Sequence, residues 1–251
     1  VDGPIARTVE DTALMLSVLA GPDLRCPITL PDSGDFLRKP LEKNLKGIRI
    51  AWSADLGGLP VDSRVTETLE DQRSVFEDMG CIVEEGFPDF SDADEIFKKF
   101  RAWFYELKLG SLLPEHRDKM KETVVWNIEA GMKLGGPELG RAEVKRTALF
   151  HRVIEFMRDY DFLALPVSQV PPFPIEQEFV SEINGVQMET YLDWMRSCYF
   201  ISVTGQPAIS VPCGFTTDRL PVGLQLVGKP QDDLGVLKLA DAFEKATEFY
   251  Q

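Results

Sequence analysis

The sequence has few of the residues from which metal and redox sites are built. Its only histidines are His116 and His151, and neither lies near a cluster of cysteines or carboxylates, so no metal site is expected. The four cysteines are scattered and form no CxxC pair: Cys26, Cys81, Cys198 and Cys213. In a chain of this length such spacing indicates reduced thiols and not a disulfide framework.

Long apolar runs and targeting signals are also missing. No uninterrupted apolar segment reaches membrane length, and there is no signal peptide pattern or Asn-x-Ser/Thr site. With the reduced cysteines, these absences predict a cytoplasmic protein without a membrane partner. The formal net charge of -14 disfavours binding to a phosphate backbone, so no nucleic-acid partner is expected.

The common catalytic motifs are absent as well. The sequence contains no GxSxG elbow, no GxxxxGK[ST] loop, no HExxH pair and no EF-hand loop. Cys198 or Cys213 could in principle be a nucleophile, but free cysteines are more often buried packing residues. Cys213 follows the apolar residues 208–211 and has no nearby cation to lower its pKa, which predicts a buried and inert thiol.

The residues that are present describe an ordinary folded protein. The chain is 44% hydrophobic and 27% charged, and it is long enough to bury a sizeable core. Residues 47–52 and 81–83 are predicted strands. Between them, at about 63–79, lies a predicted helix with one apolar face, which Asp62 or Ser63 can cap. This order and spacing predict a βαβ unit.

The remaining pattern predicts further helices and strands without a repeat or linker. Thr8 can cap a helix whose residues 13–20 are apolar nearly all round, so this helix is expected to be buried on most sides. Helices are also expected at 93–133, 141–160, 191–202 and 234–247, and strands at 162–166, 208–211 and 222–227, with a long loop at 171–187. The sequence therefore predicts one α/β unit over residues 1–251, with a mixed β-sheet between helical layers.

Two features leave both a structural and a functional interpretation open. Residues 204–207 (TGQP) form a tight turn before a strand, and loops at strand ends are where α/β proteins place ligands. The aromatic residues at 97–105 include Trp103 and could line a pocket, although helical spacing favours a core.

Several blocks of the sequence resemble the amidase-signature family, in the order in which that family has them. The two longest are residues 203–214 (VTGQPAISVPCG) and 220–228 (LPVGLQLVG). Residues 3–11 (GPIARTVED), 161–167 (DFLALPV) and 48–52 (IRIAW) with Gly57-Gly58 also look like family segments. The blocks span nearly the whole chain.

The resemblance implies an enzyme that hydrolyses amides without a cofactor. Family members use a Ser–cis-Ser–Lys triad, with an oxyanion hole formed by a glycine-rich loop. In the family these groups precede the GPIART-like block, which here begins at Gly3, and no residue of this chain matches them. The chain is therefore expected to be the C-terminal portion of one amidase-signature domain, incomplete at its N-terminal side and inactive alone; its start at Val1 agrees with a cut or trimmed protein.

What the resemblance leaves to this portion is substrate selection. The candidate residues for one wall of the acyl pocket lie at the strand end and the following turn: Pro166, Val167, Thr204, Gly205, Gln206 and Pro207, with Trp103 as a secondary candidate. The expected partners are a small amide substrate and the missing N-terminal segment, and homo-oligomerisation is left open.

Two other functions compete with an amidase. The chain could belong to a binding or assembly subunit that keeps the fold without catalysis. It could also belong to the glutamine-hydrolysing subunit of a tRNA-dependent amidotransferase, although the net charge of -14 counts against direct tRNA contact. A glycine–serine-rich stretch and a lysine before Val1 would support an enzyme, and ammonia release from glutamine would support the amidotransferase.

Overall fold

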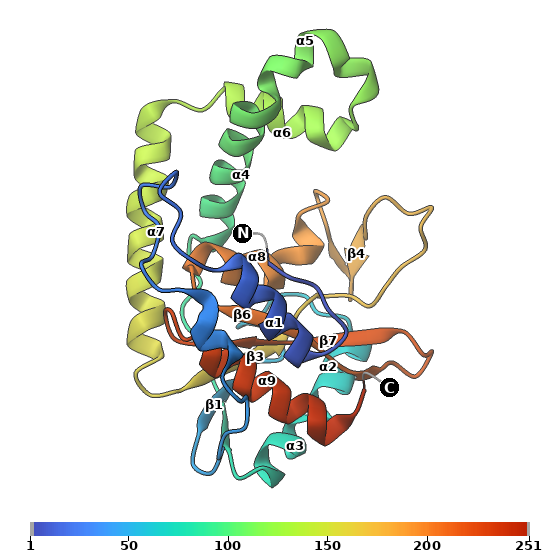
Figure 1. Cartoon of the computed structure of the whole chain (residues 1–251). Coiled ribbons are helices and arrows are strands. Elements are labelled where there is room, and N and C mark those ends of the chain that lie inside the picture. The colour runs from blue at the N-terminus through green and yellow to red at the C-terminus, as the bar shows by residue number, and fades with distance from the viewer. Residues whose placement is uncertain (1–2, 250–251) are drawn as a thin grey trace.

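A mixed five-stranded β-sheet between two helical layers forms the body of the protein (Figure 1). The structure is a computed structural model that describes residues 3–249, so the chain start at Val1 lies outside the described residues. The strand order is β2-β1-β3-β7-β6. This arrangement confirms the predicted α/β class with a mixed sheet.

The first half of the sheet is parallel. Strand β1 (Arg49–Trp52) lies between β2 (Ile82–Glu85) and β3 (Phe162–Pro166) and runs parallel to both. The crossover from β1 to β2 passes through α2 (Ser63–Glu70) and α3 (Arg73–Asp78), which confirms the βαβ unit. The crossover is two helices where the sequence pattern predicted one, because the chain turns at residues 71–72 before α3 begins.

The second half of the sheet is antiparallel and ends in an edge strand. Strand β7 (Pro221–Val227) pairs with β3 on one side and with β6 (Ala208–Phe215) on the other. The register of β6 and β7 shifts between Pro212 and Gly214, an irregularity typical of a sheet edge. The predicted pairing of these two strands is confirmed.

Alternate residues of the strands serve two separate cores. Ile50 and Trp52 face one layer, whereas Ala51 faces the other, as the period of a strand requires. The first layer consists of α1 (Val9–Leu19), α2, α3 and α9 (Asp233–Thr247), and the second of α4 (Ala93–Leu109), α7 (Gly136–Phe156) and α8 (Arg196–Thr204).

The shorter elements connect these layers. They are η1 (Gly34–Arg38), η2 (Gly110–Leu112), α5 (Leu113–His116), η3 (Arg117–Lys119), α6 (Glu122–Met132), β4 (Glu182–Ile183), β5 (Val186–Gln187) and η4 (Asp193–Met195). Strands β4 and β5 form a small hairpin inside the predicted loop at 171–187. Helix α7 begins earlier than predicted, since Pro137 is accepted in a first helical turn.

Helices α5 and α6, together with the end of α4, form an arm that projects from the body at the top of Figure 1. The aromatic cluster at 97–105 divides along α4. Phe97 and Phe100 pack against the second core, whereas Trp103 and Phe104 are exposed. Within residues 3–249, no helix is long and apolar enough to cross a membrane.

Helix α1 differs most from its prediction. Thr8 caps it as expected, since its hydroxyl accepts the Asp11 N–H, but only Val9, Ala13 and Ser17 are buried. Four large apolar residues on its other side are exposed: Leu14, Met15, Val18 and Leu19. The prediction of burial on most sides was wrong because α1 meets the described residues through one stripe only, against η1 and α9.

Candidate functional site

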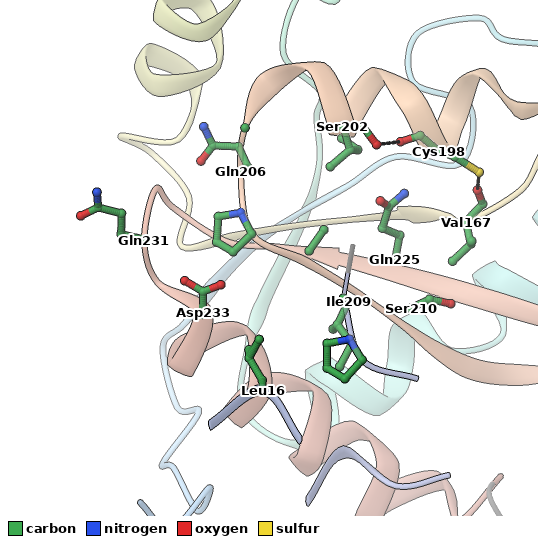
Figure 2. Close-up of a pocket in the computed structure, with 16 residues that line it drawn as sticks. Leu16, Val167, Cys198, Ser202, Gln206, Ile209, Ser210, Gln225, Gln231 and Asp233 are labelled. Atoms are coloured by element: carbon green, nitrogen blue, oxygen red, sulfur yellow. Dashed lines mark hydrogen bonds between the residues drawn. The ribbon is translucent and has the colours of Figure 1, made fainter. Parts of the chain in front are cut away.

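A hollow lies where the ends of strands β3, β6 and β7 meet helices α8 and α9. We call it the strand-end pocket; it has a volume of about 560 Å³ and is drawn in Figure 2. Its lining comes from segments far apart in the sequence: Gly3, Pro4, Leu16, Val167, Cys198, Ile201, Ser202, Gly205, Gln206, Pro207, Ala208, Ile209, Ser210, Gln225, Gln231 and Asp233.

The right side of the pocket in Figure 2 is built where β3 ends. The backbone carbonyl of Val167 accepts hydrogen bonds from the Ser197 hydroxyl, at 2.9 Å, and from the Cys198 thiol. The buried Gln169 side chain also accepts the Arg196 N–H, at 2.7 Å. These contacts attach the beginning of α8 to the end of the strand, so the residues of α8 cover the pocket from above.

The next wall is the turn that joins α8 to β6. Gly205 ends α8 in the left-handed region, at φ 74°, which glycine adopts at little cost. Pro207 then leads into β6, and its carbonyl accepts the Gly228 N–H at 2.9 Å. Gln206, between these two residues, is thereby held at the pocket.

Gln206 is the least satisfied polar side chain of this wall. The residue is 8% exposed, and neither its amide oxygen nor its amide nitrogen has a hydrogen-bond partner among residues 3–249. Buried amides are normally paired, and an unpaired one costs free energy. Gln206 therefore contributes to this wall a polar side chain whose amide atoms are buried and unpaired.

The strand register supplies the floor of the pocket. Ser210 of β6 lies directly opposite Gln225 of β7. Gly223 leaves the space between them and Val167 open, since a Cβ there would lie 3.1 Å from Val167 Cγ2 and 3.2 Å from Ser210 Oγ. Gln225 is mostly buried, and its amide nitrogen donates to the Ser197 carbonyl at 3.4 Å.

The predicted site residues divide into two groups. Val167, Gly205, Gln206 and Pro207 line the strand-end pocket together. Pro166 is buried within β3, and Thr204 is buried facing a separate hollow beside α7. Trp103 lies on α4, where its ring contacts Phe100 edge-on, and it does not line the pocket.

Several lining residues were not foreseen from the sequence. Ser210 and Gln225 carried a usable signal, because each is a polar residue inside an otherwise apolar strand. Asp233 and Leu16 carried none, since only the packing of α9 and α1 brings them to the pocket.

Two thiols lie at or near the pocket, and burial raises the pKa of both. Burial raises the pKa of Cys198, whose thiol already donates to the Val167 carbonyl. Burial also raises the pKa of Cys213 to about 12, and this side chain is fully buried, as predicted. Within the described residues no group of histidines, cysteines and carboxylates is arranged to hold a metal ion.

Comparison with known proteins identifies relatives over nearly the whole chain. The profile of the family described as Amidase matches residues 1–237. An acylamidase of Rhodococcus erythropolis is 33% identical over 248 residues, which covers 96% of this chain and 51% of the relative. A glutamyl-tRNA(Gln) amidotransferase subunit of Thermodesulfovibrio yellowstonii is 29% identical over 276 residues, covering 99% of this chain and 55% of the relative.

The fold agrees with these sequence matches. A bacterial aryl acylamidase of the amidase-signature family superposes with a TM-score of 0.88 at 26% identity, over 99% of this chain and 54% of that structure. The chain thus spans about half the length of the relatives it matches. Since the family profile covers nearly all of the sequence and the fold is shared, the chain belongs to the amidase (amidase-signature) family.

Proposed function

We propose that this chain is the C-terminal portion of an amidase-signature domain and forms one wall of its acyl pocket. The complete protein then hydrolyses carboxylic amides to an acid plus ammonia or an amine. The observation that carries the proposal is the strand-end pocket, in which Val167, Gly205, Gln206 and Pro207 converge. In α/β proteins, ligands bind in crevices at the ends of strands.

The nucleophile belongs, in this proposal, to a part of the protein outside residues 1–251. Amide hydrolysis needs a nucleophile, a base that activates it and donors for the developing oxyanion. No residue of this chain matches the family's serines or lysine, and its relatives are about twice as long. The serine attacks the amide carbonyl, the proton passes to the amine leaving group, and water then releases the acid. This chain contributes the surface that binds the acyl group.

Gln206 is the residue through which we test the role of the pocket. Substituting Gln206→Leu in the complete protein removes an amide and keeps a side chain of similar size. We expect kcat/KM to change by different factors for different amides, with differences of roughly tenfold across a panel of aliphatic and aryl amides. Gln177→Leu, an exposed glutamine outside the pocket, is the matched control.

The outcome of this experiment can contradict the proposal in two ways. Equal factors for every amide would remove the selective role of Gln206. Absence of turnover of any amide by the complete wild-type protein would contradict the amidase itself, and a non-catalytic protein for binding or assembly would then be the better interpretation.

Hydrolysis of glutamine within an amidotransferase is the second candidate function. Its support is the similarity to glutamyl-tRNA(Gln) amidotransferase subunits of several organisms, including 26% identity over 276 residues in Lactiplantibacillus plantarum. Release of ammonia from glutamine by the complete protein tests this alternative directly.

A further inference from the structure

The lining of the strand-end pocket contains one acidic residue and no basic residue. None of its 16 lining residues is lysine, arginine or histidine. Asp233 is the one lining residue with a formal charge. A ligand group that carries a negative charge would therefore meet no cation on the part of the pocket that residues 3–249 form. An unpaired charge in a partly desolvated site is costly.

Asp233 stands at the start of α9 and faces this hollow in Figure 2. Asp232, the preceding residue, caps the helix by accepting the Gly235 N–H at 3.0 Å. Asp233 has no ion-pair partner among the described residues, and it also lines the two hollows adjoining the pocket. Asp233 lies in the first turn of α9, so its position places an acidic side chain at the pocket.

The other polar groups of the lining are neutral. They include the side chains of Gln206, Gln225, Ser202 and Ser210, and the amide of Gln206 is itself buried and unpaired. A carboxamide or hydroxyl on a ligand can both donate and accept, so it can pair with the neutral side chains of Gln225, Ser202 and Ser210. A carboxylate can only accept, and in this pocket it would face Asp233 without a cation to offset its charge.

We propose that the strand-end pocket selects amide substrates whose bound group is uncharged, and that Asp233 is a specificity-determining residue that rejects a carboxylate. This inference rests on the proposed amidase function and deepens it. It favours a neutral acyl amide over free glutamine, whose α-carboxylate would need a cation that this wall does not provide. Specificity of this kind comes from a repulsive element as well as from attractive contacts.

The test compares two amides of equal chain length on the complete protein encoded by the gene. Hexanamide is neutral, whereas adipamic acid carries a terminal carboxylate that is ionised at pH 7.5. We expect kcat/KM to favour hexanamide by at least roughly tenfold, and we expect the ratio to shrink at high salt.

Three variants test whether Asp233 causes the preference for hexanamide over adipamic acid. Asp233→Asn keeps the shape of the side chain and removes its charge. It is expected to narrow the ratio of the two kcat/KM values at least about threefold, chiefly by raising kcat/KM for adipamic acid. Ser210→Asp adds a carboxylate to the same pocket from β6 and should widen the ratio. Asp118→Asn, which removes an exposed charge from η3 on the projecting arm, is the matched control and should leave the ratio unchanged.

Two results would overturn the inference. One is equal or better turnover of adipamic acid, or of glutamine, by the wild-type protein. The other is an unchanged ratio in an Asp233→Asn protein that circular dichroism shows to be folded. If neither amide is hydrolysed, the proposed function fails. The charge preference is then judged by the dissociation constants of hexanamide and adipamic acid measured by calorimetry, where equal or tighter binding of the carboxylate rejects it.

Discussion

The two halves of the sheet differ in how completely the described residues cover them. The parallel half around β1 is closed by its own helices, and Trp52 meets Phe76 edge-on at 6.0 Å within a buried core. The antiparallel half ends in the edge strand β6, beside an unpaired Gln206 and an α1 surface with exposed apolar residues. The helices of the closed, parallel half therefore bury most of its apolar residues, whereas the open, antiparallel half has a pocket and exposed apolar residues beside it.

The largest expected effect concerns the open half. Residues 1–251 produced alone should show no amidase turnover above background, because no residue of this chain matches the family's nucleophile or base. Losing one such group typically costs orders of magnitude in rate. The assay uses aliphatic and aryl amides, with the complete protein as the positive control. Turnover that co-purifies with residues 1–251 and survives exclusion of host amidases would contradict this expectation.

A substitution in the closed half should have the largest effect on stability. Phe76 is fully buried and stacks on Phe243 with ring centroids 4.9 Å apart. Phe76→Ala should lower the free energy of unfolding by about 3–5 kcal/mol, since it removes apolar contact and leaves a cavity. Urea denaturation measures the change, and Phe104→Ala on the exposed side of α4 should stay within about 0.5 kcal/mol. Equal losses for both variants would contradict the comparison.

A smaller effect that depends on pH is expected from the buried carboxylate of Asp193 in η4, before the start of α8. Burial of Asp193 opposes ionisation, but hydrogen bonds from Arg196 and Thr190 outweigh it and hold the pKa at about 2. Because the folded-state pKa is below the unfolded value, the ionised group contributes stability above pH 4. That contribution, about 2 kcal/mol, is lost as the pH falls from 4 to 2.

The substitution Asp193→Asn tests whether the ionised carboxylate stabilises the folded protein. The difference in unfolding free energy between wild type and variant should be present at pH 7 and should shrink as the pH falls from 4 to 2. Asp118→Asn serves as the exposed control and should show no such trend. A difference that stays constant down to pH 2 would mean that Asp193 does not stabilise the fold through its charge.

Exposed apolar residues of α1 predict a measurable surface property. Leu14 and Val18 lie one turn apart and are exposed, so residues 1–251 alone should bind a hydrophobic dye or self-associate. The double substitution Leu14→Glu and Val18→Glu should reduce dye fluorescence severalfold. A monodisperse wild-type chain that binds no dye would contradict the expectation that the exposed residues of α1 form an apolar surface.

The smallest effect contrasts two thiols. Cys213 lies on β6 and is fully buried, with its pKa raised to about 12, whereas Cys26 is exposed. A thiol reagent should modify Cys26 quickly and leave Cys213 unmodified until the protein unfolds. Mass spectrometry of the labelled peptides assigns the sites, and rapid labelling of Cys213 in the folded protein would contradict its burial.

The sequence alone determined the elements and the family. Strand period and the helix caps at Thr8 and Asp62 are local signals, and the structure has them as predicted, although the crossover from β1 to β2 divides into two helices. The block at residues 203–214 was specific enough to indicate the amidase-signature family, and it also located the turn at Gln206.

Only the tertiary structure decided which residues face one another. Gln225 meets Ser210 because β6 and β7 pair in one register, and Asp233 reaches the same pocket because α9 packs beneath that edge of the sheet. Tertiary packing also places Trp103 outside the pocket and buries α1 along one stripe only. Local patterns encode the period and ends of an element, whereas the partners of each face follow from long-range packing that no single segment contains.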